Sequence, residues 1–388
     1  MKRSFVIIFT INMVLRVFMQ GLLPLYPIIT EKLGASRQSN GIILASSYTM
    51  LLVSTWLSGK LVPRYTNAKS LLLISMVPMC IGMGLLGTAT TITSFVLYSL
   101  VLFFSAGMNI IAGIMLISHF SSADTVGKNF GIIGLSNLLG SLIGGFVVGP
   151  ALFNLGYFNG FLLFAAILFI VCLFTFFVQK PEGKIIIEAK HTFRFSKNFI
   201  FVLLSFVLAV MLIHVFLFSF SLSVKAAGYN ISDISIFSAI GTALTLPIPY
   251  LLGKWTTIYL PKNLLLLVYA LMGIALILLL LPKYTPIIIL AVACMSVLAY
   301  AGRAIIVALV FPWYDAKDMP LVQAYMGIAA WLAAIVGYLF SGFSLQHLGF
   351  TYTVSIGIVI AFVAIGILGK GVKTTTAITN GRSSNVFS

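Results

Sequence analysis

The chain has 388 residues, of which 61% are hydrophobic and 8% are charged, with a formal net charge of +16. Soluble domains carry about 25% charged residues, so this composition excludes a water-soluble globular protein of this size. The positive charge does not indicate nucleic-acid binding, because the basic residues lie between apolar runs and form no groove with interleaved aromatics. We therefore expect lipid to cover most of the surface.

Apolar runs long enough to cross a bilayer begin at the N-terminus. A hydrocarbon core of about 30 Å requires roughly 20 apolar residues in a helix. The segment MKRSFVIIFTI starts like a signal peptide, but it has no small-residue cleavage site, so we interpret it as part of the first span. The first half of the chain predicts six spans, at approximately 5–28, 38–58, 70–88, 93–119, 130–152 and 158–178.

A polar linker at 180–198 separates these spans, which belong to an N-terminal half at 1–179, from a C-terminal half at 199–370. The polar tail at 371–388 lacks apolar periodicity, and we expect it to be disordered. The second half predicts six further spans, at approximately 199–223, 232–252, 263–281, 285–310, 321–343 and 350–369.

The loops between the predicted spans differ strongly in positive charge. With the N-terminus inside, 17 Lys and Arg residues fall on the cytoplasmic side and four on the outer side. Short cytoplasmic loops are enriched in Lys and Arg. The chain is thus predicted to cross the membrane many times, with both termini in the cytoplasm.

The two halves of the chain repeat each other. Residues 32–60 align without a gap to residues 226–254, at a shift of 194. Two later regions match at shifts of 195 and 193, including Gly156 with Gly349. Six spans return the chain to its starting side, so the halves are predicted to be parallel, as in transporters with a site between their repeats.

The loop GKLVPRYTNAKSL and its surroundings carry a family resemblance. Gly59, Leu61 and Arg64 match the signature loop of the major facilitator superfamily, and Lys69 is a basic residue close to its final position. Pro63 stands where that family has an aspartate, so its gating charge relay is not implied. The resemblance implies twelve transmembrane helices in two parallel six-helix bundles around a central cavity, and a monomer that moves a small molecule.

Two further motifs of this family are incomplete. In the fourth span Gly107 matches, but Phe103 replaces the family's arginine. In the fifth span GSLIGGFVVGP resembles the antiporter motif, with Gly145 in place of a proline. The glycines have a simpler alternative role, because small residues allow membrane helices to pack closely.

Polar side chains mark one face of the first span. Asn12, Arg16 and Gln20 recur every four residues, which places them in one stripe along a helix. Arg16 is about 12 residues into the span, or roughly 18 Å along a helix, too deep for its guanidinium to reach the headgroups easily. We predict that it lines the cavity; bonding to backbone carbonyls is the alternative.

The later spans add further candidate cavity residues. Arg303 shares a helix face with Tyr300, although it is near enough to the inner surface to snorkel. His214, the repeat partner of Gln20, titrates near neutral pH and is a candidate for a coupling proton; simple hydrogen bonding is the alternative. The remaining candidates are Asn109, Asn137 and Trp331, of which the asparagines also suit hydrogen bonding between helices.

All seven acidic residues are predicted to lie outside the hydrocarbon region. Glu31 and Asp233 are at outer helix ends and are the remaining coupling candidates, while the other five are cytoplasmic. A cation in a low-dielectric cavity usually needs an anionic partner. The cavity is therefore predicted to favour anionic, zwitterionic or amphipathic solutes.

We predict a secondary active transporter, specifically an exporter, that works by alternating access. A proton-coupled multidrug antiporter for cationic or lipophilic drugs is the alternative. The sequence contains no Gly-x-x-x-x-Gly-Lys-Ser/Thr loop for ATP. No catalytic constellation can be assembled from the membrane residues, so neither enzymatic activity nor a metal or cofactor is predicted.

Overall fold

The computed structural model describes residues 2–65, 68–120, 126–179, 195–256, 258–282, 284–314 and 319–372, and every regular element in these ranges is helical. The predicted linker and tail lie almost entirely outside the described residues. The same holds for the predicted cytoplasmic acids, which all lie in the gaps or in the linker.

The first six spans form one bundle. Its helices are α1 (Lys2–Leu22), α2 (Tyr26–Lys32), α3 (Arg37–Tyr65), α4 (Ala68–Gly87), α5 (Ile92–His119) and α6 (Val126–Phe174), with 3-10 turns at Leu23–Leu25 and Thr175–Phe177. A short turn that begins at Leu23 and contains Pro24 links α1 to α2. The two helices together make the first crossing.

The last six spans form the second bundle. Its helices are α7 (Lys197–Ala226), α8 (Ile231–Leu244), α9 (Ile248–Trp255), α10 (Pro261–Leu280), α11 (Thr285–Val310), α12 (Met319–His347) and α13 (Phe350–Gly371), with a 3-10 turn at Phe311–Trp313. The predicted span at 232–252 is broken into α8 and α9, because Pro247 and Pro249 lack the amide protons that a continuous helix needs there.

Twelve crossings follow from the helix lengths. Within the described residues, 11 helices are long and apolar enough to cross a membrane. One of them, Leu135–Phe177, has 43 residues and passes through Gly156, whose φ of 76° and ψ of 167° are not helical. This helix therefore accounts for two crossings, and the predicted twelve-helix class is confirmed.

Turns occupied by glycine repeat between the two bundles. The four glycines with positive φ are Gly34 (89°), Gly156 (76°), Gly228 (94°) and Gly349 (84°). They form two pairs, at the shifts of 194 and 193 found in the sequence. Only glycine adopts such a φ without steric cost, so the internal repeat extends to backbone conformation.

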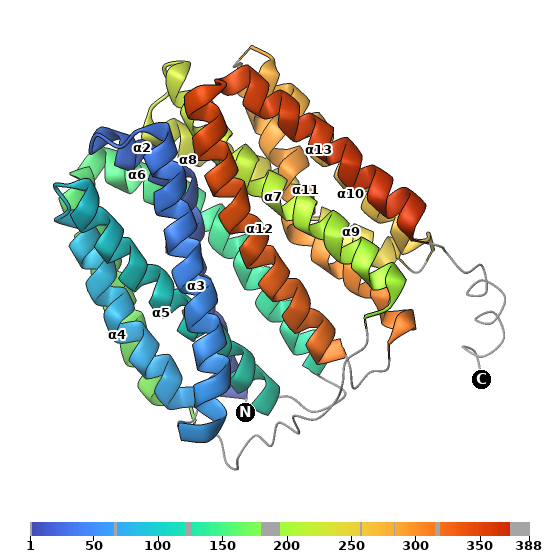
Figure 1. The fold of residues 1–388 in the computed structure, drawn as a ribbon. Coiled ribbons are helices and arrows are strands. Elements are labelled where there is room, and N and C mark those ends of the chain that lie inside the picture. The colour runs from blue at the N-terminus through green and yellow to red at the C-terminus, as the bar shows by residue number, and fades with distance from the viewer. Residues whose placement is uncertain are drawn as a thin grey trace.

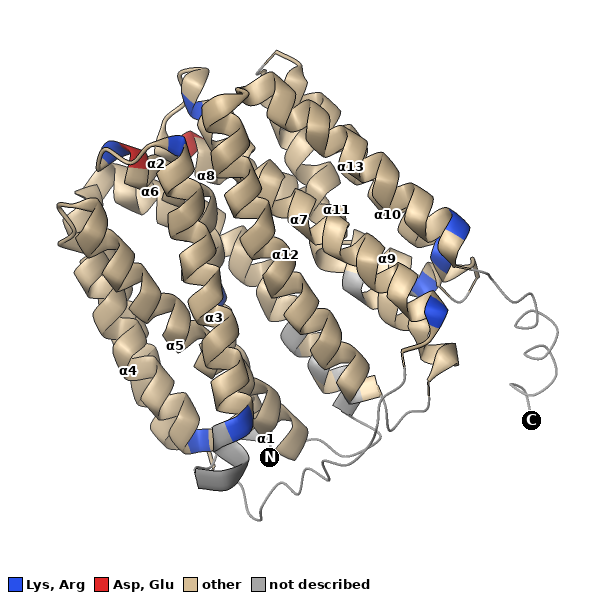
Figure 2. Cartoon of the chain, viewed as in Figure 1, with Lys and Arg blue, Asp and Glu red and all other residues tan. Residues whose placement is uncertain are grey.

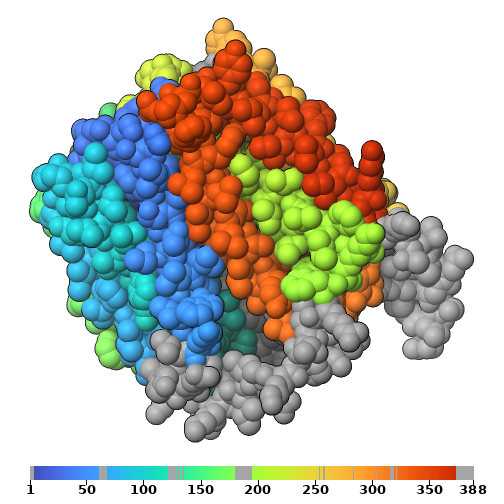
Figure 3. Space-filling view, viewed as in Figure 1, coloured from blue at the N-terminus to red at the C-terminus, as the bar shows by residue number. Residues whose placement is uncertain are grey.

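The start of α1 and the end of α13 lie at one end of the molecule, which we call the terminal end; the other, where α2 leads into α3, is the opposite end (Figure 1 and Figure 2). Lys and Arg gather near the helix ends, and the long middle stretches are almost free of charge (Figure 2). The two bundles meet where α3 packs on α12 and α6 packs on α8. The seam between α3 and α12 runs down the face seen in Figure 3.

The bundles approach most closely near the opposite end. A Cβ atom at Gly41 of α3 would lie 2.5 Å from the Tyr338 carbonyl oxygen and 2.8 Å from the Gly342 Cα of α12. The repeat partners of Gly41 and Gly342 are Ser235 and Gly149, and here the Gly149 amide donates to Ser235 Oγ at 3.3 Å. Small residues thus make both contacts between the bundles possible.

Candidate solute-binding site

Arg16 lies where the two bundles face each other. Its side chain is half-buried and interacts electrostatically with the hydroxyls of Tyr48 on α3 and Tyr300 on α11. Gly140 on α6 lets that helix pack against the backbone of α1 at the same level, since a Cβ atom there would lie 3.0 Å from the Met13 carbonyl oxygen. Arg16 makes no hydrogen bond or ion pair with any residue that the structure describes.

Tyr300 joins this region to both bundles. Its hydroxyl lies beside the side-chain hydroxyls of Ser141 on α6 and Thr242 on α8. Tyr300, a predicted cavity candidate of the tenth span, therefore lies near Arg16. The side chain of Arg303, the other predicted residue of this helix, lies outside the described part of the chain.

Four rings from both bundles form an aromatic cluster, which we define as Tyr48, His214, Trp331 and Tyr338. The ring centroid of Tyr48 is 5.1 Å from that of His214, 5.9 Å from that of Trp331 and 5.3 Å from that of Tyr338. His214 and Tyr338 are 4.7 Å apart. The structure thus brings two predicted residues, His214 and Trp331, next to a neighbour of Arg16.

The other residues of the predicted stripe on α1 differ in their environment. The Asn12 amide donates to Ser136 Oγ on α6, within the first bundle. Gln20 is half-buried, one turn of helix beyond Arg16. Residues 21–30 of this span are all buried, whereas Asn12, Arg16 and Gln20 each retain exposed surface. The exposed polar residues of this span therefore lie in its half nearer the terminal end.

The two predicted asparagines have different surroundings. Asn109 is 5% exposed and donates to Ser75 Oγ on α4 at 3.4 Å, which matches the alternative role as a link between helices. Asn137 on α6 is half-buried, and its Oδ1 is buried without a hydrogen-bond partner. Asn137 follows Ser136, the partner of Asn12, so it lies close to the level of the polar stripe on α1.

The acidic coupling candidates both lie at the opposite end and are both engaged. Glu31 Oε2 is 2.7 Å from Lys225 Nζ, in a salt bridge between the bundles. Asp233 forms a capping box with Asn230 at the start of α8. These are the only acidic residues in the described part of the chain. Neither contacts the region around Arg16.

The signature loop lies at the terminal end. Gly59 is exposed, with open space where a Cβ atom would be, and Lys69 donates to the Phe176 carbonyl oxygen at 2.8 Å. The side chains of Leu61 and Arg64 lie outside the described residues. Lys69 therefore joins α4 to the end of the sixth span within the first bundle.

Charge reversal of the bridge between Glu31 and Lys225 tests whether Glu31 is a latch or a coupling group. The Glu31 and Lys225 side chains are 35% and 41% exposed, and exposed pairs contribute about 0–1 kcal/mol. We expect Glu31→Gln to change counterflow rates no more than about fivefold, with Glu31→Lys/Lys225→Glu restoring them. A coupling carboxylate would behave differently: Glu31→Gln would abolish uptake driven by a pH gradient, and the swap would not restore it.

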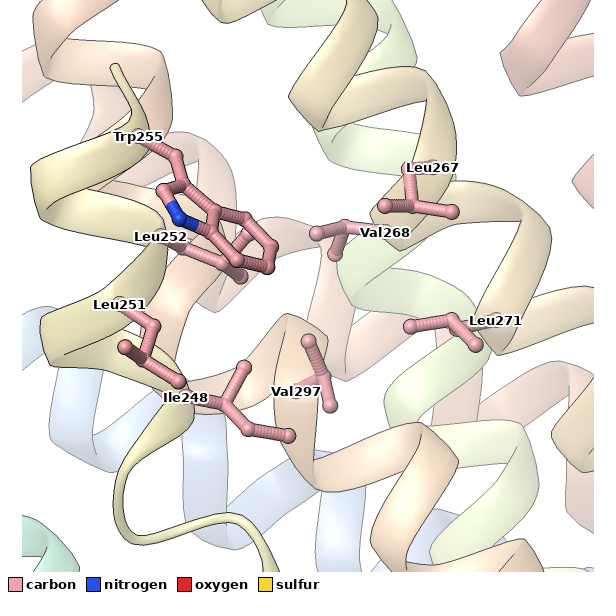
Figure 4. A pocket seen from close by; sticks show the side chains of 8 residues that line it. All are labelled: Ile248, Leu251, Leu252, Trp255, Leu267, Val268, Leu271 and Val297. Carbon is pink, nitrogen blue, oxygen red and sulfur yellow. The ribbon is translucent and has the colours of Figure 1, made fainter. Parts of the chain in front are cut away.

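A separate apolar pocket lies within the second bundle. It has a volume of about 180 Å³ and is enclosed by α9, α10 and α11. Trp255 and Leu252 of α9 face Val268 and Leu271 of α10 across it (Figure 4). Every lining side chain is apolar apart from the indole nitrogen of Trp255, so the pocket offers little to orient a polar solute. The lining residues are Ile248, Leu251, Leu252, Trp255, Leu267, Val268, Leu271 and Val297.

Sequence reasoning missed several residues of the central region. Tyr48 and Tyr338 are absent from the predicted set, as are Ser136, Ser141 and Thr242. One signal was available, because Tyr48 and Thr242 are repeat partners at the shift of 194. Both carry a hydroxyl in the middle of a span, and both lie beside the pair of Arg16 and Tyr300.

Comparisons with known proteins agree with this fold. The chain is similar to the nucleoside transporter NupG, with 14% identity and a TM-score of 0.80 over 95% of this chain and all of that one. An auto-inhibited POT family peptide transporter shows 13% identity and a TM-score of 0.74 over 96% and 98% of the two chains. The human organic anion transporter MFSD10 shows 15% identity and a TM-score of 0.66 over 95% and 99%.

Sequence comparison gives the family directly. No curated protein matches the chain. The sequence profile of the Major Facilitator Superfamily matches residues 8–302, which is more than half of the chain and includes Arg16, Tyr48, His214 and Tyr300. The twelve-helix fold and this match lead to one conclusion: the chain is a membrane transporter that belongs to the Major Facilitator Superfamily.

Proposed function

We propose that the protein is a secondary transporter that moves a small organic anion or zwitterion by alternating access between its two bundles. The observation that carries this proposal is the guanidinium of Arg16 between the bundles, which has no ion-pair or hydrogen-bond partner among the described residues. Proteins of similar fold are named as a nucleoside transporter, a peptide transporter and an organic anion transporter. Because the fold is shared across these solutes, the side chains of the central region must decide the solute of this chain.

A charge in this position requires a partner. An arginine in the middle of a membrane helix costs about 2.5–3.5 kcal/mol on insertion scales, and such residues usually face a cavity or pair with an acid. The described acids are engaged at the opposite end, so they do not neutralise Arg16. A carboxylate or similar group on the solute would supply the missing charge, with hydroxyls of Tyr48 and Tyr300 as further donors.

The contacts between bundles support a conformation open toward the terminal end. The bridge between Lys225 and Glu31 and the hydrogen bond from Arg37 Nη1 to the Leu345 carbonyl oxygen (3.3 Å) join the bundles at the opposite end. Asn12, Arg16 and Gln20 on α1 retain exposed surface, whereas residues 21–30 of the same span, nearer the opposite end, are all buried. Alternating access would then require these contacts at the opposite end to separate.

We place the terminal end in the cytoplasm of a bacterial inner membrane, and we propose export as the direction of transport. Cytoplasmic loops are enriched in Lys and Arg, and the family resemblance favours an exporter. The opposite end has three described basic residues, balanced in part by Glu31 and Asp233. The lysines at the terminal end whose side chains are described are Lys60, Lys69, Lys197, Lys254, Lys262 and Lys370.

A proton-coupled antiporter for cationic drugs has less support. A lipophilic cation would meet the positive charge of Arg16 without a described acid beside it. His214, the candidate for a coupling proton, lies among rings rather than beside an acid. Raising the external pH separates the mechanisms, because a proton-driven antiporter slows while a facilitator follows only the solute gradient.

Counterflow in proteoliposomes tests the proposed function. Vesicles loaded with an unlabelled solute would be diluted into the labelled compound, using carboxylates, zwitterionic amino acids, neutral analogues and quaternary ammonium ions in parallel. We expect exchange of anionic or zwitterionic solutes. A strict preference for the permanent cations would overturn the proposal, as would exchange of all four classes at equal rates.

A further inference from the structure

The region beside Arg16 is unusual in joining a cation to an array of rings. Tyr48 interacts with Arg16 and is also the member of the aromatic cluster that contacts all three others. Tyr48 comes from the first bundle, whereas His214, Trp331 and Tyr338 come from α7 and α12 of the second. A solute group held by Arg16 and Tyr48 therefore has rings of the opposite bundle as its next neighbours.

One polar atom of the aromatic cluster is left without a partner among the described residues. His214 is 8% exposed, and its Nδ1 is buried and makes no hydrogen bond with any of them, whereas the buried Tyr338 hydroxyl lies beside the Tyr48 hydroxyl. Most buried polar atoms in folded proteins are paired, and an unpaired one is costly. Such an atom, on a ring 4.7 Å from that of Tyr338, suggests a partner that arrives with a ligand.

Trp331 is the member of the aromatic cluster that retains exposed surface. Tyr48, His214 and Tyr338 are buried, while Trp331 remains half-buried at 5.9 Å from Tyr48. Arg16, which interacts with Tyr48, is also half-buried. A partly exposed guanidinium and a partly exposed indole thus neighbour the same phenol. This arrangement fits a solute with a negative group at one end and a flat apolar body at the other.

We infer that the solute is an aromatic or heteroaromatic carboxylate, an inference that rests on the proposed function. Its carboxylate binds Arg16, and its ring packs on Trp331 and Tyr48. A hydrogen-bonding atom on the ring pairs with His214 Nδ1 when the bundles close around it. An aromatic ring gains from offset or edge contacts with other rings, so an aromatic carboxylate should bind more tightly than an aliphatic carboxylate of the same charge.

Trp331 provides a direct readout of ring binding. A variant with Trp56, Trp255 and Trp313 replaced by phenylalanine keeps Trp331 as its one tryptophan. The purified full-length variant in nanodiscs would be titrated with benzoate, nicotinate, hexanoate and benzylamine. We expect benzoate and nicotinate to change Trp331 fluorescence and to bind at least about tenfold more tightly than hexanoate, with no binding of benzylamine.

Side-chain variants locate the preference. Trp331→Leu is expected to reduce the ratio of benzoate to hexanoate affinity to about 1, because the solute ring loses its aromatic neighbour while Arg16 is unchanged. Calorimetry would measure both affinities. His214→Phe is expected to weaken the binding of 4-hydroxybenzoate or nicotinate more than that of benzoate, because the ring's polar atom loses its partner. The matched control is Trp56→Leu, at an exposed position beside Lys60 on α3, which is expected to leave all affinities unchanged.

The outcomes separate this inference from the proposed function. Equal binding of benzoate and hexanoate, both lost in Arg16→Gln, would overturn the aromatic solute and leave the anion transporter in place. Equal binding of benzoate and benzylamine, unaffected by Arg16→Gln, would overturn the proposed function. Ring preference that survives Trp331→Leu and Tyr48→Leu would overturn the assignment of the ring to the aromatic cluster.

Discussion

Replacing Arg16 with glutamine is expected to weaken binding of the transported anion by roughly 10- to 150-fold, and counterflow at low solute concentration by a similar factor. A hydrogen bond to a charged group contributes about 1.5–3 kcal/mol, and each 1.4 kcal/mol is about tenfold in affinity. Binding would be measured by calorimetry and transport in proteoliposomes. Arg16→Lys keeps the charge but loses the planar pair of donors, so an intermediate loss is expected.

The same change is expected to leave the protein folded. Arg16 has no described salt-bridge partner, so its removal leaves no opposite charge unpaired. Insertion scales assign a cost of about 2.5–3.5 kcal/mol to an arginine at this depth. The melting temperature of Arg16→Gln should therefore equal or exceed that of the unaltered protein. Lys370→Gln, at the exposed end of α13, is the matched control for loss of one charge. Full transport by Arg16→Gln would contradict the assigned role.

Replacing Gly41 with valine is expected to stop transport while the protein still folds. Its Cβ atom would overlap the Tyr338 carbonyl oxygen and the Gly342 Cα. Both are backbone atoms, so no side chain can rotate away, and α3 must separate from α12. Overpacking typically costs about 1–3 kcal/mol, which corresponds to roughly a 5- to 150-fold shift away from the state closed at the opposite end.

Distance measurements would report this shift. Spin labels at Ser36→Cys and Gln346→Cys, exposed positions beside α3 and on α12, would follow the opposite end after Cys80, Cys172 and Cys294 are replaced by alanine. We expect longer distances for Gly41→Val and, from the other side of the contact, for Gly342→Val. Gly366→Val on α13 is the control, because its Cβ atom would meet nothing within 4 Å. Unchanged distances with normal transport in Gly41→Val would show that the contact between bundles is not needed.

The fold was largely predictable from the sequence, for a simple reason. A bilayer forces each crossing to be a continuous apolar helix with its backbone satisfied internally, so hydropathy alone predicts the number of crossings. The repeat at a shift near 194 predicted the two parallel bundles, and the positive φ of Gly34 and Gly228 follows the same alignment. The break between α8 and α9 at Pro247 was missed, because apolar composition continues through it.

The candidate site was only partly predictable. Sequence depth and helical spacing were enough to single out Arg16, because a charge in an apolar run is conspicuous and costly. They could not identify Tyr48 and Tyr338, since tyrosines are common in membrane spans and only packing shows which of them meet. Sequence position likewise could not separate Asn109, which joins α4 and α5, from residues of the central region.

The sequence by itself thus determined the twelve crossings, the parallel repeat and an intramembrane arginine without a nearby acid, because each depends on local composition or on register along the chain. The tertiary structure decided what surrounds that arginine. Contacts between α1, α3, α7, α11 and α12 depend on how two bundles cross, and residues far apart in the chain, such as Tyr48 and His214 or Arg16 and Tyr300, become neighbours only there. Small residues such as Gly41 and Gly342 set how closely those helices approach.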